Sequence, residues 1–444
     1  MPRALPHPLP DQERPIAVKG ALVLGPTPEL SQVRTLGLAG GRFVPPGELG
    51  ADAAELDAKG LVAAPGLIDL HVHLREPGFE HKETIATGTR AAVEGGFTTL
   101  CAMPNTKPPI DSTQLLEVVR DRARAAGLAR VYQYAAITRG QGGQEPCDFA
   151  ELVAAGCVGF SDDGLPVDNP RLMRDALVAL DALDRPAMIH AEERVFAPGP
   201  IHEGVVSKRL GICGIDPLAE ELMTLRDCYL AEVTGARIHI CHVSTARAAE
   251  IVRRAKARGV RVTAEACPHH LILADEAMGD GKNADYKMNP PLRTVSDVAA
   301  LRTALTDGTI DAIASDHAPH TAEEKARGLA AAPFGIVGLE TTLPLVLTHL
   351  VATGVLLLEE AIARMSAAPA RILDLPVGRI EDGAPADLVL IDLDEAWTIR
   401  KTELSSKSAN TPFDGTTVRG RAAATLVGGR LVAIRERHRA RLVP

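Results

Sequence analysis

The sequence has few of the features that mark secreted, membrane-bound or nucleic-acid-binding proteins. Its seven cysteines form no CxxC pair, which predicts reduced thiols in a cytoplasm rather than a disulfide framework. Lys and Arg number 48 against 57 Asp and Glu, so the net charge is −9 and no basic surplus is available for nucleic acid or an anionic membrane. The proline-rich first fifteen residues contain no apolar run, which indicates a disordered tail and not a signal peptide.

Long apolar runs are also scarce. The most apolar stretch, 341–358, has no Asp, Glu, Lys or Arg, and its length alone would allow a membrane span. It contains Pro344, His349 and Gly354, however, and a buried barrel helix has the same composition. With 46% apolar and 24% charged residues, the chain is typical of a soluble globular protein. We therefore expect no membrane partner.

Strand-like apolar runs alternate with helix-like segments through the middle of the chain. This alternation is typical of parallel βα units. The fold class that we expect is α/β, a (β/α)8 TIM-type barrel with its active site at the C-terminal ends of the strands. A doubly wound open sheet is the alternative, but no GxGxxG follows the first strand. The eight apolar runs are 67–72, 97–102, 131–137, 157–160, 186–190, 237–241, 260–266 and 310–314.

The two flanks of the chain differ from its middle. Residues 16–62 and 377–436 contain short β-branched runs separated by Gly and Pro. We expect these flanks to pair into one small β domain, although the whole barrel separates them in sequence. The predicted organisation is a tail plus the first part of the β domain in 1–66, the barrel in 67–375, and the second part of the β domain in 376–444.

The first barrel strand carries an HxH motif. With a strand period of two, Asp69, His71 and His73 share one face, and the apolar residues Ile68, Leu70 and Val72 share the other. We expect the apolar face to lie against the outer helices, so that both imidazoles point into the barrel. Two histidines at i and i+2 can bind one metal ion, although a hydrogen-bonded pair of core histidines would have the same spacing.

Further polar residues follow other strands at the same end of the barrel. His190 ends the fifth strand, His242 follows the sixth, Asp316 follows the eighth, and the fourth leads into 161–164 (SDDG). Such a cluster would be costly to bury unless something paired it. A pair of divalent metal ions would do so. Histidine and carboxylate ligands favour zinc, while manganese, cobalt and iron remain alternatives.

Motifs along nearly the whole chain after the tail resemble one family. Residues 65–73 (PGLIDLHVH) resemble the opening strand of the amidohydrolase superfamily, and 74–78 (LREPG) resembles its dihydroorotase family, specifically the long bacterial class. Blocks similar to that family then follow in order: 103–106 (MPNT), 202–204 (HEG), 268–270 (PHH), 286–291 (YKMNPP), 316–320 (DHAPH) and 333–338 (PFGIVG).

This resemblance implies a reaction and a ligand set. The reaction is the reversible cyclisation of N-carbamoyl-L-aspartate to (S)-dihydroorotate plus water, in de novo pyrimidine (UMP) biosynthesis. His71 and His73 would bind a first metal ion, and His190 and His242 a second. The implied cofactor is Zn2+, one or two ions per subunit, with two favoured.

The fourth strand departs from the pattern of many relatives. In those proteins a carbamylated lysine after this strand bridges the metals, but Val158 stands at that position here. The resemblance to the long bacterial class implies that Asp163 supplies the carboxylate instead. Its neighbour Asp162 is the less favoured ligand and is expected to orient the loop.

Asp316 is predicted to be both a metal ligand and the catalytic acid and base. Two cations lower the pKa of a bound water toward neutrality, so a metal-bound hydroxide can attack the ring amide carbonyl. Asp316 would accept the proton and return it to the leaving nitrogen. In the biosynthetic direction it would deprotonate the ureido nitrogen.

Substrate binding needs a local positive charge, because the substrate carries a carboxylate outside the ring. Arg75 follows His73 by two residues, and its planar guanidinium suits bidentate carboxylate binding. The resemblance adds Asn105, Asn289 and His320, together with the backbone at Phe334 and Gly335. The region 307–338 could form a mobile flap over the substrate or a fixed subunit contact.

Two other functions stay open at this point. Another cyclic-amide hydrolase, such as an allantoinase or a dihydropyrimidinase, would normally have the bridging lysine and lack the arginine of 74–78. An inactive structural homologue bound to aspartate transcarbamoylase should have lost metal ligands, whereas all six are present. We expect a cytoplasmic homo-oligomer that acts on a small molecule, with an association with aspartate transcarbamoylase as a further hypothesis.

Overall fold

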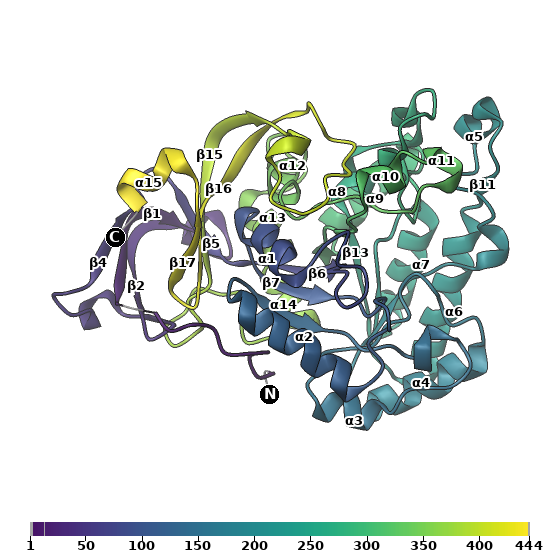
Figure 1. Ribbon diagram of the computed structural model, residues 1–444, viewed down its shortest axis with the longest axis horizontal. Helices are drawn as coiled ribbons and strands as arrows, with labels where there is room; N and C mark the ends of the chain where they lie inside the picture. The colour runs from purple at the N-terminus through teal and green to yellow at the C-terminus, as the bar shows by residue number, and fades with distance from the viewer. Residues whose placement is uncertain (1–2, 13, 443–444) are drawn as a thin grey trace.

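Both ends of the chain contribute to one sheet beside a barrel. The computed structural model describes residues 3–12 and 14–442 (Figure 1). The strands of the sheet are β1 (Ile16–Val23), β2 (Gln32–Ala39), β3 (Arg42–Val44), β4 (Ala54–Asp57), β5 (Val62–Pro65), β15 (Leu388–Thr398), β16 (Thr417–Val427) and β17 (Arg430–Ile434). Their order is β17-β16-β15-β5-β1-β2-β3, and β4 pairs with β1. Because β15 pairs antiparallel with β5, the expected joining of the two flanks is confirmed.

Parallel segments close into a barrel, on the right in Figure 1. Its strands are β6 (Leu67–Val72), β7 (Phe97–Ala102), β8 (Arg130–Gln133), β9 (Ala187–Ile189), β12 (Ile238–Ile240), β13 (Val262–Ala266) and β14 (Ala312–Ile313). The remaining position is taken by Phe160, which bridges Ala135 on one side and Ala187 on the other. A bridge between Val72 and His317 closes the ring. The predicted (β/α)8 barrel is therefore confirmed.

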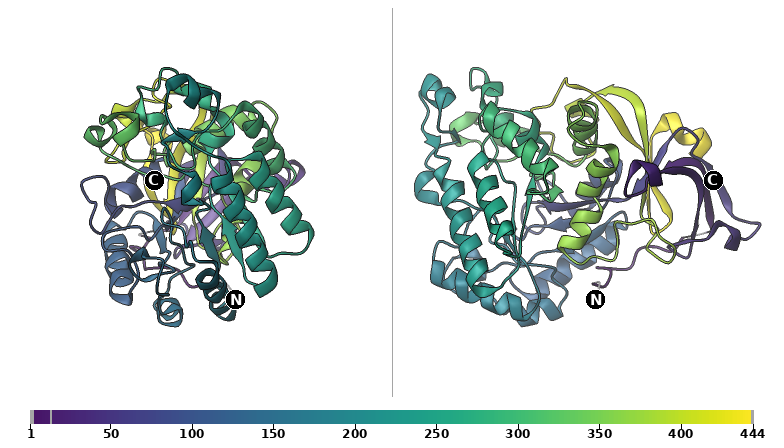
Figure 2. Two further views of the ribbon diagram at one scale, coloured as in Figure 1. Left: turned by 90° about the vertical axis from the view of Figure 1, so that its right-hand side faces the viewer. Right: turned by 180° about the vertical axis from the view of Figure 1, so that it is seen from behind.

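Helices cover the outside of the barrel (Figures 1 and 2). Those that follow barrel strands are α1 (Ile85–Glu94), α2 (Thr113–Ala126), α3 (Phe149–Ala154), α4 (Pro170–Ala182), α6 (Leu218–Thr234), α7 (Ala246–Ala257), α9 (Val295–Thr306) and α12 (Thr342–Val346). Shorter helices lie in the loops and toward the C-terminus: α5 (Val205–Leu210), α8 (Pro268–Ile272), α10 (Ala322–Lys325), α11 (Gly328–Ala331), α13 (Leu358–Arg364), α14 (Ala367–Ile372) and α15 (Glu436–Leu442). Two-residue strands β10 (Ile201–His202) and β11 (Gly214–Ile215) pair beside α5.

The strict alternation expected for the first barrel strand is wrong in part. Val72 packs in the cluster shared with the outer helices, but Ile68 and Leu70 pack in a different cluster with Tyr134 and Met188. That cluster draws residues from strands all around the ring, so it fills the barrel interior. The pairing of β6 with β7 has register shifts after Leu67 and after Asp69, which break the period of two.

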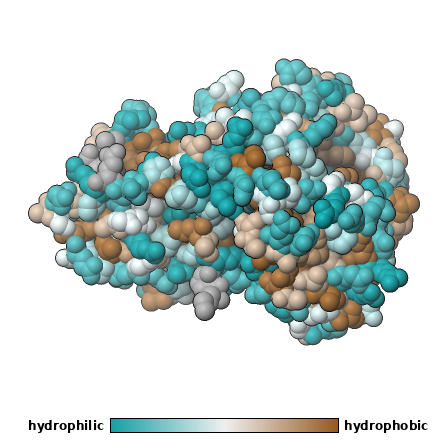
Figure 3. Space-filling view, turned by 60° about the horizontal axis from the view of Figure 1, so that its bottom comes forward, coloured by the Kyte–Doolittle hydropathy of each residue, from teal (hydrophilic) through white to brown (hydrophobic). Residues whose placement is uncertain are grey.

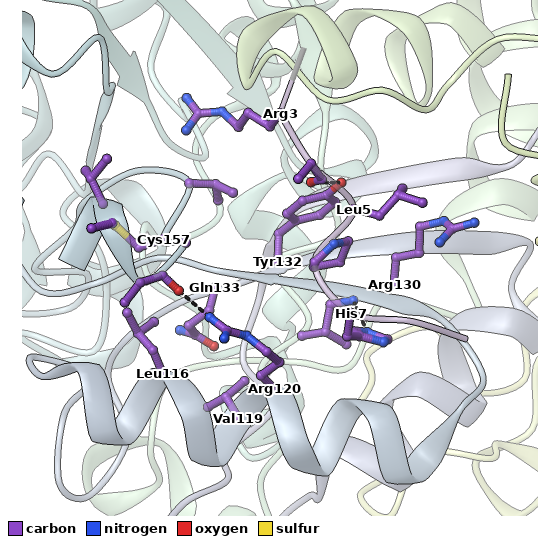
Figure 4. A pocket seen from close by; sticks show the side chains of 18 of the residues that line it. Arg3, Leu5, His7, Leu116, Val119, Arg120, Arg130, Tyr132, Gln133 and Cys157 are labelled. Carbon is purple, nitrogen blue, oxygen red and sulfur yellow. Dashed lines mark hydrogen bonds between the residues drawn. The ribbon is translucent and has the colours of Figure 1, made fainter. Parts of the chain in front are cut away.

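Residues 3–9, part of the segment that is expected to form a disordered tail, lie against the barrel in the structure. Arg3 N–H donates to Asp374 O at 2.8 Å, and Val131 N–H donates to His7 Nε2 at 3.2 Å. The segment covers a cavity of about 630 Å3 above Tyr132 and α2 (Figure 4).

The apolar stretch 341–358 is broken in the structure. It forms α12, a short π-helical turn (Leu347–Val351) and the start of α13. Over residues 3–12 and 14–442, none of the helices combines the length and apolar character that crossing a membrane requires. On the face drawn in Figure 3, hydrophilic residues dominate, and apolar side chains gather mainly on the barrel side, at the right.

Candidate metal centre and substrate pocket

The six predicted metal ligands lie together at the C-terminal ends of the barrel strands. His71 belongs to β6, and the other five residues follow within three residues of a strand end or of the bridge residue Phe160. Each is at most 6% exposed. The structure therefore brings all of them into one buried cluster: His71, His73, Asp163, His190, His242 and Asp316.

Asp163 lies between the two histidine pairs. Its Oδ1 is 3.4 Å from His71 Nε2, 3.5 Å from His190 Nδ1 and 3.8 Å from His242 Nε2, and its Oδ2 is 3.7 Å from His73 Nε2. Two groups of three ligand atoms, each spanning at most 4.8 Å, share this carboxylate: His71–His73–Asp163 and Asp163–His190–His242. One carboxylate common to two neighbouring sites is suited to a pair of cations.

Buried atoms without partners test whether such ions fit. Among the described residues, His71 Nε2, Asp163 Oδ1 and His242 Nδ1 are buried and have no hydrogen-bond partner. An unsatisfied buried polar atom costs about 1–3 kcal/mol. A cation held by His71 Nε2 and Asp163 Oδ1 would remove two of these costs. Imidazole and carboxylate donors suit divalent zinc and related metals, so the residues fit the implied ions.

The charges in the cluster favour a cation as well. Burial alone would raise the pKa of Asp163, but the charge of His71 and the nearby imidazoles of His190 and His242 hold that pKa well below its usual value. Burial alone would lower the pKa of His190, but Asp163 and Glu192 raise it to about 10. Without a bound ion, protons on the histidines would supply the positive charge that the ionised carboxylate requires.

Backbone strain coincides with the site. Arg75, His242 and Asp316 have φ values of 62°, 35° and 48°, in the left-handed region that residues other than glycine rarely adopt. Each such residue costs on the order of 1–3 kcal/mol and persists only where the surrounding structure holds it. All three lie just after barrel strands, where His242 and Asp316 contribute to the cluster and Arg75 lies beside it, against His320.

Two polar side chains orient the histidines of β6. Glu265 Oε1 lies 3.0 Å from His71 Nδ1, and Asn105 Oδ1 lies 2.8 Å from His73 Nδ1. The other end of the Asn105 amide donates to Asp163 Oδ2 at 3.0 Å. These contacts fix both rings with Nε2 toward Asp163. The amide of Asn105, which is predicted to bind substrate, is thus already hydrogen-bonded to two of the candidate metal ligands, His73 and Asp163.

The second histidine pair has its own support. Glu192 Oε2 lies 3.4 Å from His190 Nε2, and Asn289 Nδ2 donates to Glu192 Oε1 at 3.1 Å. Since His190 Nδ1 faces Asp163 and His242, Glu192 holds the ring from the opposite side. The sequence reasoning missed Glu192 and Glu265. Glu265 could have been found from the sequence, because a carboxylate inside the apolar run 260–266 needs a buried polar partner.

The two aspartates that follow the fourth strand point in different directions. Asp162 Oδ1 accepts hydrogen bonds from the Ile137 and Thr138 N–H groups at 2.8 and 3.1 Å, so this carboxylate faces the loop after β8. Burial raises the pKa of Asp162 to about 6. Val158 packs in the apolar cluster inside the barrel. Only Asp163 of the pair points toward the histidines.

Positively charged side chains lie beside this buried cluster of candidate metal ligands. Arg75 Nε donates to Pro319 O at 3.2 Å, and its Nη2 lies 3.1 Å from His320 Nε2. Lys82 Nζ donates to His320 Nδ1 at 3.2 Å, so His320 Nε2 carries the proton and donates to Phe334 O at 2.7 Å. Burial and the charges of Arg75 and Lys82 lower the pKa of His320 far below its usual value, which keeps the ring neutral.

The loop that contains Phe334 and Gly335 is held from two directions. Lys325 Nζ and Asn410 Nδ2 each donate to Gly335 O at 2.9 Å, and Gly335 N–H donates to Lys287 O at 3.0 Å. Both backbone groups of Gly335 therefore have partners in this structure, and a substrate contact at Gly335 stays a prediction that requires the loop to move. Asn410 comes from the segment between β15 and β16, which crosses from the small domain to the barrel mouth (Figure 1).

A buried polar cluster at the mouth of an α/β barrel is the arrangement of the amidohydrolases, and comparison with known proteins agrees. The Dihydro-orotase-like family model matches residues 60–248, and the Amidohydrolase family model matches 226–433. A dihydroorotase of Anaeromyxobacter dehalogenans is 48% identical over 420 residues, covering 94% of this chain and 97% of the relative. A dihydroorotase of Halalkalibacterium halodurans is 50% identical over 382 residues, covering 86% and 89%.

The fold is shared more widely. The L-hydantoinase (dihydropyrimidinase) of Arthrobacter aurescens superimposes with a TM-score of 0.84 at 24% identity, over 94% of this chain and 96% of that one. This similarity bears on the fold alone. The bacterial dihydroorotases are 48–50% identical to this chain over most of their own length. The chain therefore belongs to the dihydroorotase family.

Proposed function

We propose that this protein catalyses the reversible cyclisation of N-carbamoyl-L-aspartate to (S)-dihydroorotate. The observation that carries the proposal is the position of Arg75, whose guanidinium lies against His320 beside the metal cluster. A cyclic amide with an exocyclic carboxylate can then place its ring at the cluster and its carboxylate on Arg75. The identity to dihydroorotases over nearly the whole chain supports the same substrate.

We propose that two Zn2+ ions are held by His71, His73, Asp163, His190, His242 and Asp316. Bound there, divalent ions would activate a water molecule and polarise the ring carbonyl. Support comes from the shared position of Asp163 and from the partnerless atoms His71 Nε2 and Asp163 Oδ1. Metal identity and ion count can be read from elemental analysis of the purified protein.

We propose that Asp316 transfers the proton of the reacting nitrogen. Burial alone would raise the pKa of this carboxyl, but a hydrogen bond from His73 and the charges of His71 and His73 hold it well below its usual value. The ionised Asp316 can accept the proton of the ureido nitrogen during cyclisation and return it to the ring nitrogen during hydrolysis. Its Oδ1 lies 3.3 Å from His73 Nε2, so the carboxylate sits at the cluster where the reacting bond must lie.

The substrate carboxylate is proposed to bind Arg75, with Asn105, Asn289, His320 and the backbone at Phe334 and Gly335 nearby. Arg75 Nε already donates to Pro319 O, a hydrogen bond that orients the guanidinium. A fixed guanidinium loses less conformational freedom when it binds a carboxylate.

The test compares dihydroorotate with 5,6-dihydrouracil, the same ring without the carboxylate, and with allantoin. We expect turnover of dihydroorotate in both directions and little turnover of the other two. Faster hydrolysis of dihydrouracil or allantoin would favour the rival cyclic-amide hydrolases. Failure to turn over any of the three, in protein with full metal occupancy, would favour the inactive homologue. A cytoplasmic location and an association with aspartate transcarbamoylase stay predictions.

A further inference from the structure

The segment that follows β13 brings three residues of metal-binding types close together. Cys267 comes directly after the strand, and His269 and His270 lie in the short helix α8 (Figure 1). One ligand atom of each residue lies within 4.8 Å of those of the other two. All three side chains are buried, and none of them belongs to the six candidate ligands described above. The group therefore needs an explanation of its own.

His270 is oriented as metal-binding histidines commonly are. Its Nε2 lies 2.9 Å from Pro290 O, and since a carbonyl oxygen can only accept, Nε2 carries the proton. Nδ1 of the neutral ring is then left with a lone pair. In the described part of the chain this buried Nδ1 has no hydrogen-bond partner. A histidine that binds a metal through one nitrogen usually donates the other to a carbonyl or a carboxylate in this way.

His269 supplies a second nitrogen in the same condition. Its Nε2 is buried and has no hydrogen-bond partner among residues 3–12 and 14–442. The side chain is 1% exposed, and its ring centroid lies 4.2 Å from that of His270. Each buried polar atom without a partner destabilises the fold, because it has lost its hydrogen bonds to water. Contact between the two rings does not restore those bonds, whereas one ion bound to both nitrogens would.

Cys267 adds a sulfur ligand in a setting that attracts positive charge. Burial, together with the negative charges of Asp316 and Glu265, raises the pKa of this thiol well above its usual value. The thiol therefore keeps its proton when no ion is bound. An entering cation binds the sulfur and releases that proton to solvent, because metals bind the thiolate form. The two carboxylates that disfavour a bare thiolate favour a cation beside it.

We propose that Cys267, His269 and His270 form a separate binding site for one Zn2+ ion, distinct from the metal cluster. The proposal does not depend on the proposed reaction. A thiolate with two imidazoles is a zinc-type ligand set, whereas Mg2+ and Ca2+ prefer oxygen ligands. Tetrahedral bonds of about 2.0–2.3 Å place ligand atoms roughly 3.3–3.6 Å apart, so side-chain rotations that close about 1 Å complete the site. The fourth position is left for water.

Cobalt(II) distinguishes this site from the metal cluster, whose six candidate ligands include no sulfur. Cobalt(II) occupies zinc sites, and a cobalt–thiolate bond gives a strong near-ultraviolet charge-transfer band that histidine and carboxylate ligands do not give. The full-length metal-free protein is titrated with Co2+ while absorbance and bound cobalt are measured. We expect the wild type to show this band. It should also bind one more cobalt per chain than Cys267→Ser, which should lack the band.

Cys241→Ser is the matched control. Cys241 is also buried, 2% exposed, but it lies near other candidate ligands, His71 and Glu265. This variant should keep the band, and its cobalt count should exceed that of Cys267→Ser.

Variants of the histidines test the other two ligands. His269→Asn and His270→Asn should each weaken binding of this one ion at least tenfold. A wild-type protein without the band at saturating cobalt would overturn the proposal. So would equal cobalt counts in the wild type and Cys267→Ser, or a band lost only in Cys241→Ser. None of these measurements uses turnover, so failure here leaves the proposed reaction untouched.

Discussion

Replacing Asp163 by asparagine removes the one negative charge that both histidine pairs share. Asparagine keeps the shape and can still contact Asn105, so the change is mainly electrostatic. Asp163 oxygens lie 3.4–3.8 Å from nitrogens of the four histidines. At about 4 Å and an effective dielectric constant of 20, a pair of unit charges interacts by about 4 kcal/mol. A carboxylate facing two divalent ions makes several such interactions.

The expected loss of metal affinity is correspondingly large. Relaxation and water entry reduce the Coulomb energy, but even about 2.8 kcal/mol is a hundredfold change in Kd. We therefore expect at least a hundredfold weaker binding of one ion in Asp163→Asn, measured by competition with a chelator and elemental analysis, and loss of most turnover. Asp162→Asn is the control, because its carboxylate faces Ile137 and Thr138, and it should keep both ions.

Bicarbonate provides a second control on the same reasoning. Val158 cannot form a carbamate, so metal loading of the wild-type apo-protein should be the same with and without bicarbonate. Full metal occupancy in Asp163→Asn, or loading that depends on bicarbonate, would refute the assignment of Asp163 as the shared ligand.

Three further predictions concern the same pocket. Removal of metal by a chelator should abolish turnover and added zinc should restore it; activity in a demonstrably metal-free sample would contradict this. Arg75→Ala should lower kcat/KM for dihydroorotate by on the order of a hundredfold, about 3 kcal/mol for a charge-assisted contact, with metal content unchanged. Wild-type kinetics would make Arg75 only a structural residue. Asn410→Ala removes the hydrogen bonds that Nδ2 donates to Ala318 O and Gly335 O and the one that Oδ1 accepts from the His320 N–H, and it should raise KM about tenfold with kcat and metal content little changed. An unchanged KM would show that the loop keeps its position without Asn410.

The cluster of candidate metal ligands could be predicted from the sequence mainly because barrel topology determines where strand-end residues meet. Once the apolar runs are assigned to parallel strands, the residues that follow them must meet at one end. His190, His242 and Asp316 needed only that rule. Asp163 needed the resemblance, since Asp162 occupies an equivalent place in sequence. The structure separates the two by direction: one carboxylate faces backbone N–H groups and the other faces histidines.

The contacts that hold the loop containing Phe334 and Gly335 could not be predicted from barrel topology. Asn410 lies 75 residues beyond Gly335, in a segment between two strands of the small domain, and nothing in its local pattern indicates the barrel mouth. Lys325 resembles a surface lysine in sequence but is buried, with Nζ donating to three backbone carbonyls. The packing of Ile68 and Leu70 inside the barrel could not be predicted from the sequence of β6 alone either. Register shifts depend on the neighbouring strand, which a single strand's pattern does not contain.

The net charge of −9 and the proposed dianionic substrate are compatible because charge acts locally. Arg75, Lys82 and Lys325 all lower the pKa of His320, so three cations lie near one buried ring. Burial also lowers the pKa of Lys325 to about 8, which shows that its charged form is poorly solvated. An anion at the mouth would stabilise these cations, and the closed barrel would shield that interaction from solvent. A net negative surface excludes long polyanions, whereas a small dicarboxylate needs only this pocket.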